Sequence, residues 1–150
     1  MEILEFNDNL APHFRDLNLA WIKKYFTVEP MDDEMLSNPK KYVIDKGGYI
    51  FFAKVDNEIA GTFALLKMTD KVYKLTKMAV DEKFQRQKIG ANLLEFCIQH
   101  GRNLGADKII LFSNTVLGPA IHLYRKHGFQ EIPLSDVEYD RSNIKMEKVL

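Results

Sequence analysis

The first third of the chain combines one strand-like run with one helical repeat. Residues 2–6, EILEF, read as a short strand. Over residues 10–25 the large apolar side chains recur every three or four positions, which predicts an amphipathic helix. The polar stretch 27–38 predicts a loop or a single turn of helix. Asn38-Pro39 then has the pattern of an N-cap and first helical residue, and predicts a short helix.

β-Branched and aromatic residues gather in three successive runs after the pair Gly47-Gly48. Short polar stretches separate these runs, and Asp56-Asn57 has the composition of a hairpin turn. Short turns join antiparallel neighbours, so we predict a three-stranded meander. Its strands cover residues 49–55, 59–68 and 72–80.

The second half of the chain alternates helical and strand patterns. A helix that starts near residues 88–90 ends at Gly105, and the apolar run 108–113 predicts a buried strand. A further helix lies between Gly118-Pro119 and Gly128, and two strands follow. The predicted order is β-α-α-β-β-β-α-β-α-β-β, an α+β fold with a mixed sheet in one domain, residues 1–150. The step from 72–80 to 108–113 is a parallel, right-handed crossover.

Composition narrows the class of protein but does not identify it. The 150 residues include 21 basic and 21 acidic side chains, so no overall positive field favours nucleic acid or an anionic membrane. Cys97 is the single cysteine, which excludes an intrachain disulfide and suggests a reducing compartment. We see no leader peptide and no apolar run near the roughly 18 residues of a spanning helix. We therefore expect a soluble, cytoplasmic protein. We expect no metal site, because the four histidines lack the spacing of metal ligands.

The loop after the strand 72–80 carries the first hint of chemistry. Gln85, Arg86, Gln87 and Lys88 directly precede a helix start, and Gly90 lets a ligand approach the backbone closely. The first amides of a helix have no intrahelical partner and favour an anion, above all phosphate. A solvated polar loop explains the same residues equally well, because a single glycine is a weak phosphate signal.

Three motifs together resemble the GNAT acyltransferase superfamily. Residues 85–90, QRQKIG, resemble the acetyl-CoA pyrophosphate loop, Arg/Gln-x-x-Gly-x-Gly/Ala, with lysine in place of the middle glycine. Residues 120–129, AIHLYRKHGF, are similar to the family's Ala-x-x-x-Tyr…Gly-Phe helix, and residues 77–80, KMAV, look like the end of its fourth strand. The resemblance implies a GNAT-like acyl-CoA N-acyltransferase fold in which strands four and five are splayed.

The resemblance also implies roles for individual residues. The Met78 amide would face the thioester oxygen as an oxyanion hole, and the Tyr124 hydroxyl would meet the departing sulfur. Ordinary core packing is the alternative for both side chains. The implied acetyl-CoA contacts are Met78, Ala79, Val80, Gln85, Arg86, Gln87, Lys88, Ile89, Gly90, Ala91 and Asn114. For Asn114, a loop-capping role is the alternative.

Two positions depart from the family pattern. We expect Lys88 to have ordinary helical dihedral angles, which suit a lysine; a positive φ would instead strain the loop. Lys74 stands where many family members place a glutamate base. Glu29, His122 and Asp140 are nominated as replacements, each also explained as a surface or capping residue.

The acceptor side is less well defined. Residues 21–36 correspond to a lid over the acceptor, and their aromatic and acidic side chains suit an amine, although a core with a solvated face explains them too. Tyr25 and Glu29 are candidate acceptor contacts, and Arg141 is a candidate clamp for a substrate carboxylate. A solvated loop arginine is the equal alternative.

The sequence thus favours an N-acetyltransferase that moves an acetyl group from acetyl-CoA to a primary amine, of a small molecule, by direct attack in a ternary complex. The alternative is a non-catalytic sensor domain that binds CoA or a metabolite. Cys97 lies on an apolar helix face, which speaks against a covalent cysteine relay. We expect acetyl-CoA and an amine as partners, no nucleic acid and no membrane, and we consider a homodimer through exposed strand edges.

Overall fold

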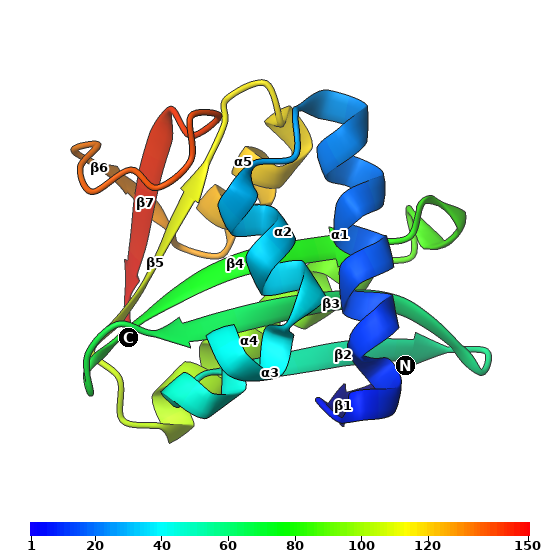
Figure 1. Ribbon diagram of the computed structural model, residues 1–150. Coiled ribbons are helices and arrows are strands. Elements are labelled where there is room, and N and C mark those ends of the chain that lie inside the picture. Colours follow the sequence, from blue (N-terminus) through cyan, green and yellow to red (C-terminus); the bar gives the residue numbers. More distant parts are fainter.

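A seven-stranded mixed sheet forms the centre of the molecule in the computed structural model, which describes residues 1–150 (Figure 1). The strands lie in the order β1-β2-β3-β4-β5-β7-β6. Every pair is antiparallel except β4 with β5. The predicted order of helices and strands is confirmed apart from one additional helix before the second strand, and the single parallel crossover is present.

The N-terminal segment supplies one edge strand and three helices. These elements are β1 (Glu2–Glu5), α1 (Ala11–Tyr25), α2 (Pro30–Ser37) and α3 (Pro39–Tyr42). The prediction of a loop or single turn over 27–38 was wrong, because eight of these residues form α2. This helix begins with Pro30 and buries Met35, Leu36 and Asp32, so tertiary contacts of three side chains dock an otherwise polar segment.

The predicted meander is present with nearly the expected bounds. It consists of β2 (Tyr49–Val55), β3 (Glu58–Lys67) and β4 (Val72–Val80). Asp56 and Asn57 have φ values of 50° and 63° and join β2 to β3. A two-residue turn with positive φ at both positions matches the twist of a hairpin, and asparagine and aspartate tolerate that conformation.

The C-terminal half builds the other side of the sheet. It contains α4 (Ile89–Asn103), β5 (Lys108–Ser113), α5 (Gly118–Lys126), β6 (Gln130–Ile132) and β7 (Ile144–Val149). Gly105 and Gly128 follow α4 and α5 at φ values of 75° and 91°. Both glycines therefore end their helices in the left-handed conformation that favours this residue.

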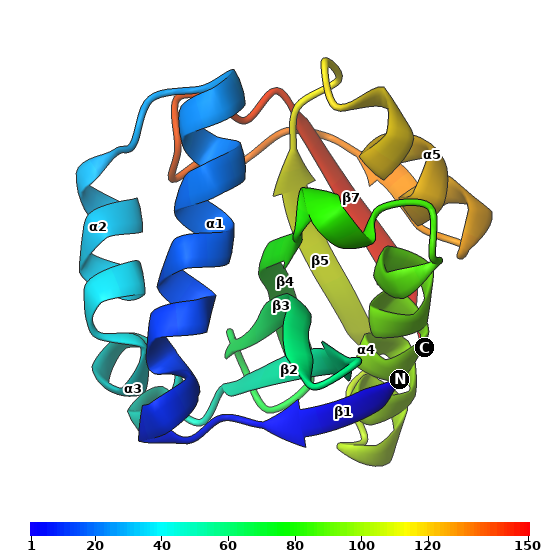
Figure 2. The ribbon, with the colours of Figure 1, turned by 90° about the vertical axis from the view of Figure 1, so that its right-hand side faces the viewer.

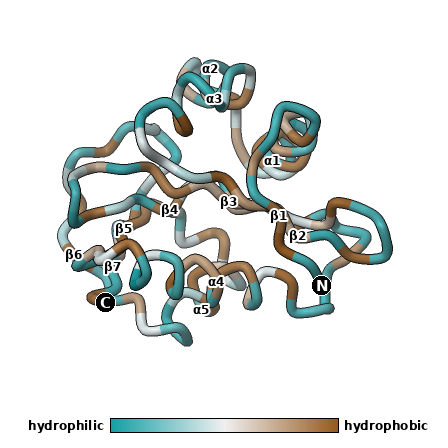
Figure 3. The backbone as a smooth tube through the Cα atoms, turned by 90° about the horizontal axis from the view of Figure 1, so that it is seen from below, coloured by the Kyte–Doolittle hydropathy of each residue, from teal (hydrophilic) through white to brown (hydrophobic).

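Helices cover both faces of the sheet (Figures 2 and 3). Helices α4 and α5 pack on one face, over the larger core that includes Leu93, Ile109 and Phe129. Helices α1 to α3 lie on the other face, over a smaller core that includes Phe14 and Phe52. None of the helices combines the length and apolar character needed to cross a membrane.

Strands β4 and β5 diverge after a short paired stretch, as Figure 1 shows. Their parallel pairing joins residues 72–75 to residues 108–111 and stops there. The last five residues of β4 remain paired only with β3 on the opposite edge. The predicted splay of strands four and five is therefore confirmed, and it opens the sheet at one end.

Candidate active site

A cavity of about 250 Å³ lies where β4 and β5 part. Its walls come from the ends of both strands, from α1 and α5, and from the segment before β7. The residues that line it are Trp21, Tyr25, Phe26, Lys74, Leu75, Thr76, Lys77, Met78, Ala79, Val80, Gln85, Leu111, Phe112, Ser113, Asn114, Leu117, Ala120, Tyr124, Tyr139, Arg141 and Ser142. The predicted residues Met78, Ala79, Val80, Gln85, Asn114 and Tyr124 thus share one cavity.

A β-bulge shapes one wall of this cavity. Thr62 pairs with Ala79 and Ala64 pairs with Thr76, so Lys77 and Met78 together oppose the single residue Phe63. Lys77 has a φ of 55°, a left-handed conformation that a lysine rarely adopts outside such a bulge. Since no strand pairs with this stretch of β4 on the cavity side, the backbone around Met78 borders open space.

The amino end of α4 lies beside the same opening. The Asn92 amide donates to the Lys88 carbonyl at 3.0 Å, so the amides of Ile89, Gly90 and Ala91 precede the first intrahelical bond. The Arg86, Gln87 and Lys88 side chains are exposed around them. Three free amides at the positive end of a 15-residue helix form an anion-binding geometry.

The expectation for the Lys88 backbone was wrong. Lys88 is the N-cap of α4 and has a φ of 61° and a ψ of 23°, in the left-handed region. Arg86 also has a positive φ, 67°. The middle position of the loop therefore has the conformation for which glycine is best suited, and its lysine stores backbone strain of about 1–2 kcal/mol.

Gly90 has space around it in the protein alone. A Cβ atom there would meet Leu123 Cδ2 at 3.6 Å and Val80 Cγ2 at 3.9 Å, which are ordinary contacts. Its φ is not in the left-handed region. The chain itself therefore does not require glycine at this position, which is consistent with a requirement imposed by a ligand.

Tyr124 projects from α5 into the cavity and packs against Phe129, with 5.9 Å between ring centroids. Burial is the main reason why the pKa of its hydroxyl is raised to about 12. The group is therefore protonated at neutral pH. A protonated phenol that lines a cavity can donate a hydrogen bond to a ligand there.

Asn114 follows β5, and both polar atoms of its side chain form hydrogen bonds within the protein. Its Nδ2 donates to the Arg141 carbonyl at 2.7 Å, and its Oδ1 accepts from the Val116 amide at 2.8 Å. The residue lines the cavity, and it also caps the adjoining loop, which was the alternative to a role as an acetyl-CoA contact. One of its Nδ2 hydrogens remains available to a ligand.

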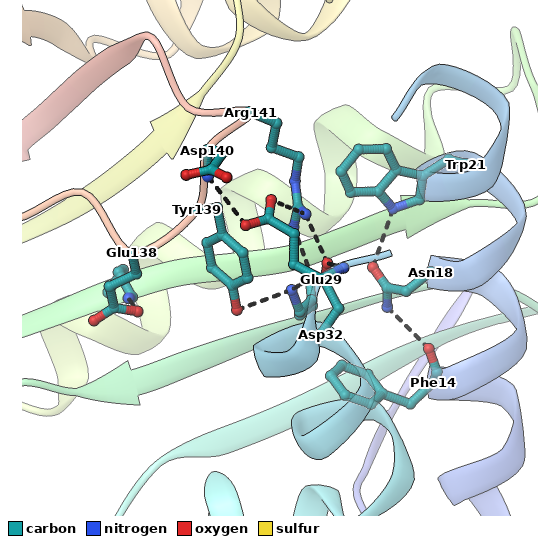
Figure 4. Close-up of polar contacts among 11 residues, drawn as sticks. Phe14, Asn18, Trp21, Glu29, Asp32, Glu138, Tyr139, Asp140 and Arg141 are labelled. Carbon is teal, nitrogen blue, oxygen red and sulfur yellow. Dashed lines mark hydrogen bonds and ion pairs between the residues drawn. The ribbon is translucent and has the colours of Figure 1, made fainter. Parts of the chain in front are cut away.

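A buried ion cluster closes the side of the cavity opposite α4 (Figure 4). Asp32 of α2 accepts two parallel hydrogen bonds from the Arg141 guanidinium, both at 2.7 Å, and one from Lys77 Nζ at 2.5 Å. The Glu29 amide donates a fourth bond, at 2.9 Å. All four lone-pair directions of the carboxylate are thus occupied. The cluster joins α2, the bulge of β4 and the segment before β7.

The charges in this cluster stabilise one another. Burial raises the pKa of Asp32, but the hydrogen bonds from Arg141 and the charge of Lys77 outweigh it and hold the pKa at about 2. Burial lowers the pKa of Lys77 to about 8; Asp32 opposes this shift, whereas Arg141 and Lys74 add to it. Both groups are ionised at neutral pH.

The nominated bases lie away from the reacting centre. Glu29 binds Arg141 and the Asp140 amide, while His122 and Asp140 are exposed, and none of the three lines the cavity. Lys74 does line the cavity and donates to Glu138 at 2.8 Å. Among the candidate acceptor contacts, Tyr25 borders the cavity, and the Arg141 fork is already occupied by Asp32.

The most buried polar residues of the site, Lys77 and Asp32, are not among the predicted site residues. In the sequence, Lys77 belongs to the strand motif KMAV, and Asp32 is one of several acids in the expected lid. A signal existed for Lys77, because a charged residue inside an apolar strand needs a buried partner or a bulge. No comparable signal marks Asp32, which is one of four acids in α2 and its cap.

Comparisons with known proteins agree with this geometry. Residues 14–129 match the model of the acetyltransferase (GNAT) family. An uncharacterized N-acetyltransferase, YvbK, of Bacillus subtilis is 29% identical over 99 residues, which are 64% of each chain. The matched region thus spans just under two thirds of that relative and about half of the mammalian N-acetyltransferase 8 proteins.

Solved structures resemble the whole chain. The crystal structure of a GNAT-family acetyltransferase from Staphylococcus aureus superposes with a TM-score of 0.88 at 25% identity, covering 99% of this chain and 98% of that one. An aminoglycoside 6'-N-acetyltransferase complexed with coenzyme A shares the fold, with a TM-score of 0.74 at 17% identity and coverage of 99% and 97%. The chain belongs to the GNAT acetyltransferase family.

Proposed function

We propose that the protein is an N-acetyltransferase that moves the acetyl group of acetyl-CoA to the primary amine of a small molecule. The main support is the cavity between β4 and β5, which holds a protonated tyrosine and extends to Gln85, in the loop that leads to the free amides of α4. Coenzyme A in the aminoglycoside 6'-N-acetyltransferase neighbour supports the choice of cofactor. The amides of α4 would bind the pyrophosphate, with Arg86 and Lys88 adding positive charge.

The unpaired edge of β4 suits the amide-bearing arm of the cofactor, because an extended chain with amides can bind a strand edge as an additional strand. The Met78 amide would then donate to the thioester oxygen as negative charge develops on it. The amine nitrogen forms the new C–N bond, the C–S bond breaks, and Tyr124 stabilises the departing thiolate through its O–H. The proton released by the amine goes to water or to the thiolate.

The site favours a neutral amine without a dedicated base. No aspartate or glutamate lines the cavity, so no carboxylate there stabilises an ammonium. The Lys77 ammonium shows the effect of this environment on an amine, since burial and two neighbouring cations lower its pKa to about 8. An acceptor ammonium in the same surroundings would be shifted in the same direction and lose its proton more readily.

A sensor without turnover is the second candidate. The left-handed lysine at position 88 supports it, because strain in the loop weakens a cofactor site. A thiol-release assay with acetyl-CoA and a panel of primary amines tests both candidates. Release that depends on the amine, with the acetylated product seen by mass spectrometry, supports the enzyme. Binding of acetyl-CoA by calorimetry without release from any amine identifies a sensor.

A further inference from the structure

The acceptor side of the cavity is lined by cations and by no acid. Lys74 and Lys77 come from β4, and Arg141 comes from the segment before β7. Each charge is held in place by a partner that does not itself line the cavity: Glu138 for Lys74, and Asp32 for the other two. The carboxylates thus lie behind the cations, and the cations are the charges that a ligand meets first.

Some N–H groups of these cations have no hydrogen-bond partner in the protein. An ammonium has three donors, and Lys74 Nζ uses one, on Glu138. Lys77 Nζ uses two, on Asp32 and, at 3.2 Å, on the Tyr139 hydroxyl. Of the five N–H groups of Arg141, those on Nη1 and one on Nη2 are engaged. Donors therefore remain on Lys74 and Arg141 for an acceptor with oxygen atoms, whereas Lys77 is fully buried and contributes its charge.

A fourth cation adds to the positive field. Lys145 lies 5.1 Å from the centre of the Phe112 ring, and Lys74 lies 5.7 Å from the same ring. Its Nζ donates to the Ser135 hydroxyl at 3.0 Å and forms no ion pair with a carboxylate. Lys145 is only 9% exposed, so little solvent screens its charge. Phe112 itself lines the cavity.

We propose that the acceptor is a primary amine that also carries an acidic group, with its amine directed to the Met78 end of the cavity and its acidic group to Lys74. This inference rests on the proposed function and names the class of substrate for it. The two ends are four residues apart on β4, a distance of about 13 Å along an extended strand. The Lys74 ammonium lies 5.7 Å from the centre of the Phe112 ring, which lines the same cavity, so it is within reach of an amino acid bound there.

The cations on the acceptor side of the cavity also disfavour the binding of polycations. A polyamine or an aminoglycoside brings several ammonium groups, and each would need an acidic partner in the cavity. The acids behind the cavity already have partners: four bonds saturate Asp32, Glu29 binds Arg141 and the Asp140 amide, and Glu138 accepts from Lys74. A second positive charge on the acceptor therefore meets Lys74, Lys77 or Arg141 without compensation.

The test compares matched amines that differ only in the acidic group. Amino acids, their methyl esters, the corresponding decarboxylated amines and a polyamine are assayed with acetyl-CoA by thiol release. We expect kcat/KM to be at least tenfold higher for the free acids than for their esters. Equal or higher values for the esters or the polyamine would overturn the proposal.

Two variants test whether Lys74 is responsible for the preference for free acids over esters. Lys74→Met keeps the apolar stem and leaves Glu138, which is 37% exposed, in contact with water. We expect kcat/KM for the acids to fall at least tenfold, and by a larger factor than that for the esters. Lys40→Met, an exposed lysine of α3 outside the cavity, is the matched control and should leave both values unchanged. An unchanged ratio of acid to ester in Lys74→Met would remove Lys74 from recognition.

A binding measurement separates this inference from the proposed function. The same acids, esters and polyamine are titrated by calorimetry into the protein saturated with CoA. Tighter binding of the acids, with no turnover of any amine, would retain the acidic acceptor class and reject the enzyme. Turnover with tighter binding of the polyamine would retain the enzyme and reject the acidic class.

Discussion

Lys77 and Asp32 form a fully buried ion pair between the bulge of β4 and the first turn of α2, with Nζ and Oδ1 2.5 Å apart. The two residues are 45 positions apart in the chain. Arg141, a further 64 residues along, binds the same carboxylate. One buried aspartate thus positions three elements around the acceptor end of the cavity, and its loss would affect all three.

Substitutions in the cluster around Asp32 should lower the free energy of unfolding by different amounts. Asp32→Asn leaves Lys77 and Arg141 buried with no carboxylate between them, and we expect a loss of about 3–5 kcal/mol in the free energy of unfolding. Lys77→Met leaves Asp32 paired with Arg141, so we expect about 1.5–3 kcal/mol. Urea unfolding at neutral pH measures both. Asp33→Asn, at the exposed neighbouring position, is the control. Equal urea midpoints for Asp33→Asn and Asp32→Asn would show that the cluster does not stabilise the fold.

Tyr124→Phe tests the proposed leaving-group donor. The substitution removes a hydroxyl with a pKa raised to about 12 and keeps the ring against Phe129. We expect kcat to fall by about 10²-fold, a typical contribution of general acid catalysis, with little change in the KM for acetyl-CoA. Steady-state kinetics measures both, with Tyr42→Phe on α3 as the control. Equal kcat values for Tyr124→Phe and the wild type would exclude the tyrosine from the mechanism.

The elements that local pattern specifies were predicted closely. The strand 108–113 and the turn Asp56-Asn57 agree with the structure, because apolar runs and turn residues act over a few positions. The resemblance to the GNAT family supplied the splay of β4 and β5, which periodicity does not specify. Helix α2 was missed because Met35 and Leu36 are its only buried apolar residues, and tertiary contacts, including those of Asp32, outweigh its polar composition.

The candidate site was predicted where backbone motifs define it and missed where distant side chains meet. Gln85, Asn114 and Tyr124 share one cavity, as the resemblance implied. The pairing of Lys77 with Asp32 depends on a bulge and on a helix that the pattern did not reveal. Contacts between residues so far apart in the chain are set by the fold, so composition and spacing carry no information about them.

Lys88 provides a test of backbone strain that is independent of charge. Lys88→Gly and Lys88→Ala both remove the ammonium, but only glycine adopts a φ of 61° without strain. We expect the glycine variant to be more stable than the alanine variant by about 1 kcal/mol in urea unfolding, and to bind acetyl-CoA more tightly. Equal stability of the two variants would show that the loop relaxes at no cost when its lysine is replaced.

Gly90→Val tests whether the amides of α4 bind the pyrophosphate. A Cβ atom at this position meets only ordinary contacts in the protein, so the fold should tolerate it, while the branched side chain crowds the space in front of the free amides. We expect acetyl-CoA affinity to fall at least tenfold by calorimetry. Gln99→Val, at an exposed position further along α4 and outside the proposed site, controls for the cost of a β-branched residue in the helix. An unchanged dissociation constant for Gly90→Val would assign this loop another role.

His100 should make the protein less stable in mild acid. Its Nε2 is buried without a hydrogen-bond partner, and its ring packs between aromatic side chains, 4.6 Å from Tyr49 and 4.9 Å from Phe51. Burial lowers the pKa of the imidazole, and the nearby Glu5 carboxylate opposes the shift only in part. Below the ordinary imidazole pKa of about 6.5, the unfolded chain therefore binds more protons than the folded protein.

The direction of the effect follows from this difference in proton binding. The contribution of neutral His100 is fully present above about pH 6.5 and is lost as the pH falls toward the lowered pKa of the folded state. Urea midpoints measured between about pH 7.5 and 5 should therefore decrease, and His100→Phe, which keeps a ring in the aromatic cluster, should reduce that decrease. His13→Gln removes an exposed imidazole and should leave the slope unchanged. Parallel profiles for His100→Phe and the wild type would mean that the imidazole is readily hydrated in the folded protein.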